Sequence, residues 1–113
     1  MAMVVGTASL AEADDVVRVV QSEPVTIPAA SGGFPGRAAA AAQCPAGETR
    51  TGGGAIVTAG NSYADRYQLG ASAPIGGESW WAFATNSDPS SPGTLQVYAL
   101  CAKVVSAPVL TTP

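Results

Sequence analysis

Two stretches decide how this chain of 113 residues folds: CPAGETRTGGG at residues 44–54 and VYALCA at residues 97–102. Each cysteine lies at the end of a strand-like segment, and the two are 57 positions apart. One disulfide between Cys44 and Cys101 fits a small chain rich in glycine and proline, while two free buried thiols would give the same cysteine count. A bridge over this span removes roughly 4 kcal/mol from the advantage of the unfolded state. We expect Cys44 and Cys101 to pair.

Composition limits the classes of function. The length is that of one domain, and many of the apolar residues are alanines, which contribute little on burial. The core is therefore thin. The net charge of −3 with five scattered basic residues argues against nucleic acid as a partner. The absence of histidine removes the commonest general base and the commonest transition-metal ligand.

Both ends differ in composition from the middle. Residues 1–13 end in a small-x-small pattern and predict the remnant of a secretion signal, or a disordered leader. This apolar run is shorter than the ~20 residues that a bilayer requires, so we expect no membrane span. Residues 14–105 form the predicted single domain, and residues 106–113 a tail.

Short β-branched or alternating segments separated by Gly, Pro and Asn turns predict an all-β fold. The expected strands are residues 16–21, 25–27, 37–43, 48–57, 67–72, 80–85 and 94–103. Residues 37–43 contain five alanines, which favour a helix by propensity. We predict a strand there, because so short a helix is marginal and would have to stop at Cys44-Pro45. The expected architecture is a small antiparallel β-sandwich, or a barrel-like variant, of six or seven strands closed by one disulfide.

Aromatic residues give the only plausible binding chemistry. Gly52, Gly53 and Gly54 inside a strand indicate that a bulky ring packs close, and we assign that ring to Trp81. Because Trp80 then points the other way, we expect it near the surface. With Tyr63 and Tyr67 it would form a contact face, although the pattern favours ordinary packing of these rings.

Four carboxylates are candidates for catalysis: Glu48, Asp65, Glu78 and Asp88. Two of them could in principle serve a glycoside hydrolase, but all lie in turn-rich segments, and we expect solvated loop charges. Oxygen ligands at Asn61, Asp65, Asn86 and Asp88 do not follow a calcium-loop pattern. We predict no enzyme, no catalytic residue, no metal and no cofactor.

Several short motifs, in order, resemble those of a poorly characterised group of actinobacterial secreted proteins and phage tail-associated or virion modules. They are Cys44-Pro45-Ala46-Gly47, Gly52-Gly53-Gly54, Ser72-Ala73-Pro74, Trp81, Asn86 and Tyr98-Ala99-Leu100-Cys101-Ala102. The resemblance implies a disulfide-closed β module outside the cytoplasm or on a virion. We therefore expect a non-catalytic secreted or surface-exposed protein with a structural or binding role, its partner a cell-surface glycan or protein.

Three alternatives stay open. The first is a virion component, such as a tail-fibre or capsid-decoration module that works as a homo-oligomer. The second is a small extracellular glycan-active enzyme, which would depend on the four carboxylates. The third is a purely structural role in which the aromatic rings only pack.

Overall fold

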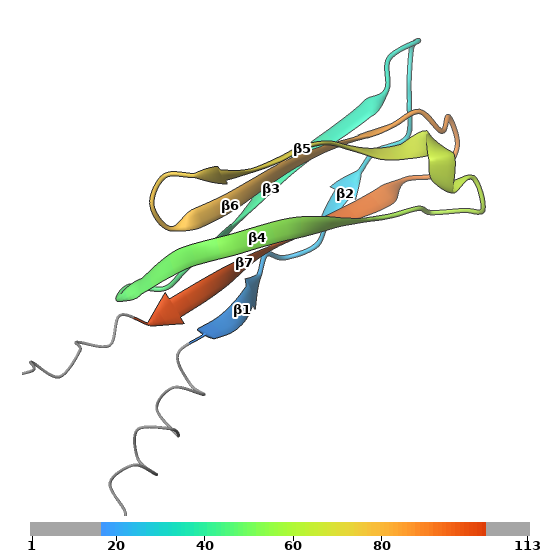
Figure 1. Ribbon diagram of the computed structural model, residues 1–113. Coiled ribbons are helices and arrows are strands. Elements are labelled where there is room, and N and C mark those ends of the chain that lie inside the picture. The colour runs from blue at the N-terminus through green and yellow to red at the C-terminus, as the bar shows by residue number, and fades with distance from the viewer. Residues whose placement is uncertain (1–16, 104–113) are drawn as a thin grey trace, which may run out of the picture.

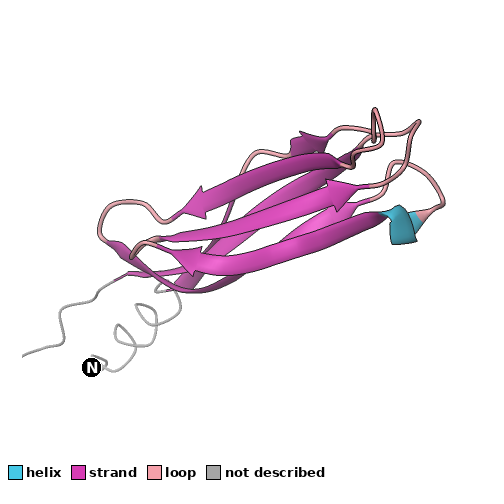
Figure 2. Ribbon diagram, turned by 90° about the horizontal axis from the view of Figure 1, so that it is seen from above, coloured by secondary structure: helices cyan, strands magenta, loops and turns pink. Residues whose placement is uncertain are grey.

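The computed structural model describes residues 17–103, which form a sandwich of two antiparallel sheets, as predicted (Figure 1, Figure 2). The strands are β1 (Val17–Gln21), β2 (Val25–Ile27), β3 (Gly36–Gln43), β4 (Glu48–Thr58), β5 (Tyr67–Ile75), β6 (Ser79–Asn86) and β7 (Gly93–Lys103), with one short 3-10 helix at Ala64–Arg66. The predicted leader 1–13 and tail 106–113 lie outside the described residues. None of the described residues belongs to a helix long and apolar enough to cross a membrane.

The first sheet is built around β7. β4 pairs with one side of β7, and β1 and β2 pair with the two halves of its other side. Ser22 joins β1 to β2 in place of a regular ladder pair. Its hydroxyl accepts the N–H of Val97 at 3.0 Å, and its own N–H donates to the Val97 carbonyl at 2.8 Å. Strand pairing along this side of β7 is thus continuous except at Ser22.

The second sheet has the order β3-β6-β5. β3 is the alanine-rich segment, and all eight of its residues pair with β6 without a shift of register. Cross-strand pairing therefore overrides the helix propensity of alanine, as predicted from the short length of the run. A bulge at Gly70 interrupts the pairing of β5 with β6 between Leu69 and Ala71.

The core lies between the two sheets and consists mostly of small side chains. From β7, the alternating residues Leu95, Val97, Ala99 and Cys101 are fully buried, as the sequence pattern predicts. The facing strands contribute mainly the buried alanines Ala42, Ala82 and Ala84. The predicted disulfide between Cys44 and Cys101 is present and joins the two sheets.

Three consecutive glycines in β4 make room for rings and side chains on both faces of the sheet. A Cβ on Gly53 would overlap the indole of Trp80 on the inner face. On the outer face, Tyr98 lies over Gly54 and Leu100 over Gly52. The glycines thus accommodate bulky neighbours as predicted, but the tryptophan among them is Trp80.

Candidate functional site

The predicted contact face of Trp80, Tyr63 and Tyr67 does not form. Trp80 points inward against Gly53 and the core, and its Nε1 donates a hydrogen bond to Ser72 Oγ at 2.8 Å. Trp81 therefore points outward, so the two tryptophan roles are the reverse of those predicted. Alternation along a strand separates the two rings onto opposite faces, but it does not tell which face is buried.

The two tyrosines lie at the other end of β6. Tyr67 pairs with Asn86, six residues from Trp80, which places it about 20 Å away along the strand. Tyr67 is only 7% exposed, and its hydroxyl donates to the Ser91 carbonyl at 2.8 Å. Tyr63 is 54% exposed, with the guanidinium of Arg66 4.2 Å from its ring centroid. Tyr67 is thus a packing residue, and Tyr63 is a surface ring in contact with Arg66, far from Trp80.

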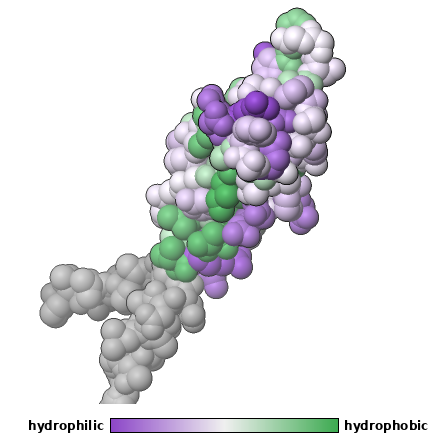
Figure 3. Space-filling model, turned by 90° about the vertical axis from the view of Figure 1, so that its right-hand side faces the viewer, coloured by the Kyte–Doolittle hydropathy of each residue, from purple (hydrophilic) through white to green (hydrophobic). Residues whose placement is uncertain are grey.

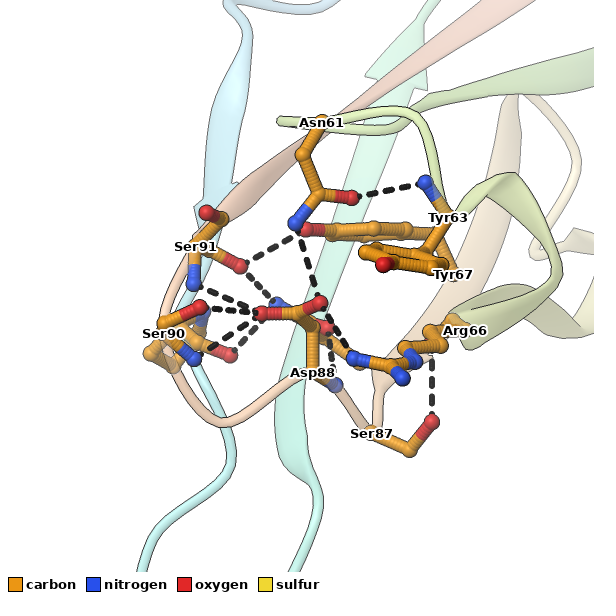
Figure 4. Close-up of polar contacts among 10 residues, drawn as sticks. Asn61, Tyr63, Arg66, Tyr67, Ser87, Asp88, Ser90 and Ser91 are labelled. Carbon is orange, nitrogen blue, oxygen red and sulfur yellow. Dashed lines mark hydrogen bonds and ion pairs between the residues drawn. The ribbon is translucent and has the colours of Figure 1, made fainter.

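A buried carboxylate organises this end of the sandwich (Figure 4). Asp88 is fully buried, which corrects the prediction that it is a solvated loop charge. Its Oδ1 accepts the Ser90 and Ser91 N–H groups at 2.9 and 2.8 Å and the Ser90 hydroxyl at 3.0 Å. Its Oδ2 accepts Nδ2 of Asn61 at 2.9 Å and Nη1 of Arg66 at 3.0 Å. We call these five residues the Asp88 cluster.

The donors determine the charge state of Asp88. The Asn61 amide, together with the Ser90 and Ser91 N–H groups and the Arg66 guanidinium, holds the pKa of this carboxyl well below its usual range, although burial acts in the opposite direction. Asp88 is therefore ionised at neutral pH. Hydrogen bonds occupy both oxygens, so the carboxylate connects the segments that donate to it.

Asn86 extends the Asp88 cluster into the core. It is fully buried, and its Oδ1 accepts the Asp88 N–H at 2.8 Å. Its Nδ2 donates to the carbonyls of Pro28 at 3.2 Å and Ser91 at 2.9 Å. Asn86 thus ties the loop after β2 to the loop between β6 and β7. Figure 3 faces this end of the molecule and shows hydrophilic residues gathered over it.

The other three predicted carboxylates lie at the start of β4, in the 3-10 helix and in the turn between β5 and β6. Glu48 begins β4 and forms a double hydrogen bond with Arg18, at 3.0 and 2.8 Å, with a side chain only 9% exposed. The prediction of a solvated loop charge is therefore wrong for Glu48. Asp65 and Glu78 are exposed, as expected. Within residues 17–103 no three Asp, Glu, Cys or His side chains gather as a set of metal ligands.

The outer face of the second sheet carries a half-buried aromatic pair, Trp81 and Phe83. The rings of Trp81 and Phe83 are parallel within 9°, with centroids 6.4 Å apart. Phe83 leans over Gly70, where a Cβ would lie 2.9 Å from its Cδ2. The pairing register places only small residues beside the two rings: Ala39 and Ala41 on β3, Ala71 and Ala73 on β5. We call Trp81, Phe83 and these four alanines the aromatic face.

Because the residues beside Trp81 and Phe83 are small, their side chains leave the two rings accessible to a ligand. Trp81 and Phe83 are half-buried, and Ala39 and Ala41 are exposed. No charged residue lies within this set. The sequence already placed Trp81 and Phe83 on one side of β6, but only the inward position of Trp80 against Gly53 shows that this side is the outer one.

Comparison of the chain with protein-family models, curated proteins and solved structures gave no match. The resemblance to actinobacterial secreted and phage-associated modules accordingly remains a prediction.

Proposed function

We propose that this protein is a non-catalytic extracellular module that binds a glycan through its aromatic face. The observation that carries the proposal is the parallel Trp81–Phe83 pair on an otherwise alanine-lined outer surface. Flat rings with an apolar face suit the apolar face of a sugar ring, and tryptophan is the side chain that most often dominates a binding surface. The small neighbours allow a flat ligand to approach both rings.

The disulfide supports an extracellular location. Such bonds persist in oxidising compartments and are rare in the cytosol. A core filled largely by alanine depends on that bond more than a core of large side chains would. Secretion thus fits both the covalent link and the thin core.

Binding of the oxidised protein to a glycan array tests the proposal. Trp81→Ala should weaken binding at least about tenfold, because a central aromatic contact typically accounts for more than 1.4 kcal/mol. Phe34→Ala is the matched control, since Phe34 is 71% exposed but belongs to the hairpin before β3. That variant should bind as the wild type does.

Two results would overturn the assignment. Glycan binding that survives Trp81→Ala unchanged would remove the aromatic face from the site. A protein ligand that depends on Trp81, with no glycan bound, would replace the glycan by a protein partner.

A further inference from the structure

β3 is an edge strand, and the backbone groups on its outer border form no hydrogen bonds within the described chain. β3 pairs only with β6. The N–H of Cys44, which follows β3, donates to the Glu78 carbonyl next to β6 at 2.8 Å. Since backbone groups alternate in direction along an antiparallel strand, the even-numbered residues of β3 face β6 and the odd-numbered ones face away.

The residues that face away are Arg37, Ala39, Ala41 and Gln43. All four are exposed. Among residues 17–103 their N–H and C=O groups have no hydrogen-bond partner outside the β3–β6 ladder. β3 is also straight in register over its whole length and contains no proline. Such a border is a template for another strand.

The other sheet borders are protected in ways that β3 is not. The border formed by β1 and β2 is interrupted at Ser22, and Pro24 and Pro28 flank β2. β4 shifts register between Arg50 and Gly52. β5 has the bulge at Gly70 and contains Pro74. Bulges and prolines are the usual means of preventing edge-to-edge pairing, so the open border of β3 is distinctive.

We propose that β3 pairs with β3 of a second copy in an antiparallel, two-fold symmetric dimer. Pairing of the outward-facing residues places Ala39 opposite the partner's Ala41, and Arg37 opposite the partner's Gln43. The axis passes between the two copies of Ala40. This register forms about eight backbone hydrogen bonds, two for each hydrogen-bonded pair.

The side chains suit this register. Methyl groups meet at the centre, where the two strands approach most closely. Arg37 meets a neutral amide, and the two copies of Arg37 lie at opposite ends of the seam, about 20 Å apart. No like charges oppose one another across the seam. A second copy therefore fits this border without a charge that would repel it.

The pairing would create one continuous six-stranded sheet. The two β6 strands would then lie three strand spacings apart, which places the two Trp81–Phe83 pairs about 14 Å from each other on the same surface. The dimer itself does not depend on glycan binding. If both proposals hold, the dimer presents two binding faces to one extended ligand.

Light scattering after size exclusion, over a dilution series of the oxidised protein, tests the dimer. We expect a species of twice the chain mass of 11.2 kDa that dissociates on dilution. The double variant Ala39→Lys/Ala41→Lys places lysines opposite one another at two symmetric positions, and should weaken dimerisation at least about tenfold. The matched variant Ala39→Lys/Ala41→Glu places opposite charges together in the same register and should still dimerise.

A proline pair tests the direction of the backbone groups. Ala41→Pro removes an N–H that faces the open border, so the fold should persist while the dimer is lost. Ala40→Pro removes an N–H that faces β6, and should instead lower the thermal stability of the monomer. A wild-type protein that is monomeric throughout the series would overturn the proposal. Equal dimerisation of the two lysine-containing variants would also overturn it.

Discussion

The two ends of the sandwich hold the same two sheets together by different means. At one end, the Cys44–Cys101 disulfide links β3 and β7 covalently. At the other end, the Asp88 cluster connects three segments through hydrogen bonds to a single carboxylate. The two ends are about 26 Å apart along β6, measured from Glu78, whose carbonyl accepts the Cys44 N–H, to Asn86. The alanine-rich core lies between these two attachments.

The two ends differ in the polar groups that have to be satisfied there. At the disulfide end the polar contacts are peripheral: Arg50 Nη1 donates to the carbonyls of Gly76 at 2.8 Å and Ser79 at 2.9 Å, across to the β5–β6 turn. At the Asp88 end, long loops must be ordered, and their backbone N–H groups need acceptors. A buried ionised carboxylate satisfies several donors at once. The disulfide at one end and the Asp88 cluster at the other thus compensate for the small stabilisation that the thin core provides.

Reduction of the disulfide should have the largest effect on stability. The bond closes a loop with a sequence separation of 57, so its loss should lower the free energy of unfolding by about 4 kcal/mol. Urea denaturation of oxidised and reduced protein, followed by tryptophan fluorescence, measures the difference. The oxidised protein should also be two hydrogens lighter than the reduced one. Equal midpoints would show that this end does not need the covalent link.

Asn86→Ala should have the next largest effect. The substitution leaves the Pro28 carbonyl without a donor and the Asp88 N–H without an acceptor, and a buried group left unpaired costs about 1–3 kcal/mol. Ser87→Ala is the control, because Ser87 is exposed and its hydroxyl makes only a 3.4 Å contact with the Arg66 carbonyl. If the two variants unfold at the same urea concentration, the buried amide does not hold the loops.

Acidification should weaken the Asp88 end selectively. The donors around Asp88 lower its pKa below the ordinary value of 3.8, so its contribution is complete above about pH 4 and is lost as the pH falls further. Urea midpoints measured between pH 7 and pH 2 should therefore decline more steeply for the wild type than for Asp88→Asn. Parallel pH profiles for the two proteins would contradict this role for the carboxylate.

Tyr67→Phe should have the smallest effect of the series. It removes the hydrogen bond to the Ser91 carbonyl and keeps the ring, which costs about 0.5–1.5 kcal/mol. Tyr63→Phe is the matched control, since Tyr63 is exposed. A shift in thermal midpoint for Tyr67→Phe alone would place the phenol among the contacts that order the β6–β7 loop; no shift would exclude it.

The sequence was sufficient to place the strands but insufficient for the orientation of their faces. One strand end was also wrong, because β5 continues through Pro74 to Ile75 instead of ending at Ser72. Alternation in β7 predicted its buried residues, and the short alanine run predicted strand β3. The same alternation in β6 left the inner face undecided, because both faces carry a tryptophan. Only the proximity of Gly53, distant in the sequence, determines that Trp80 is the inner ring.

The burial of Asp88 was also beyond the sequence pattern. Its surroundings of Ser, Pro and Asn are typical of an exposed loop. Two of the donors that bury it, Asn61 and Arg66, come from the segment between β4 and β5, and no local signal predicts that these loops meet. The sequence around Asp88 therefore did not predict that residues more than twenty positions away would donate hydrogen bonds to its carboxylate.

A double-mutant cycle tests most directly whether the disulfide and the Asp88 cluster stabilise the fold independently. The free energy of unfolding is measured for wild type and Asp88→Asn, each oxidised and reduced, in a buffer with enough osmolyte to keep the reduced protein folded. Because the two ends lie far apart and share no partner, the losses should add within about 0.5 kcal/mol. A coupling of more than about 1 kcal/mol would contradict this account and show that the two ends act as one unit.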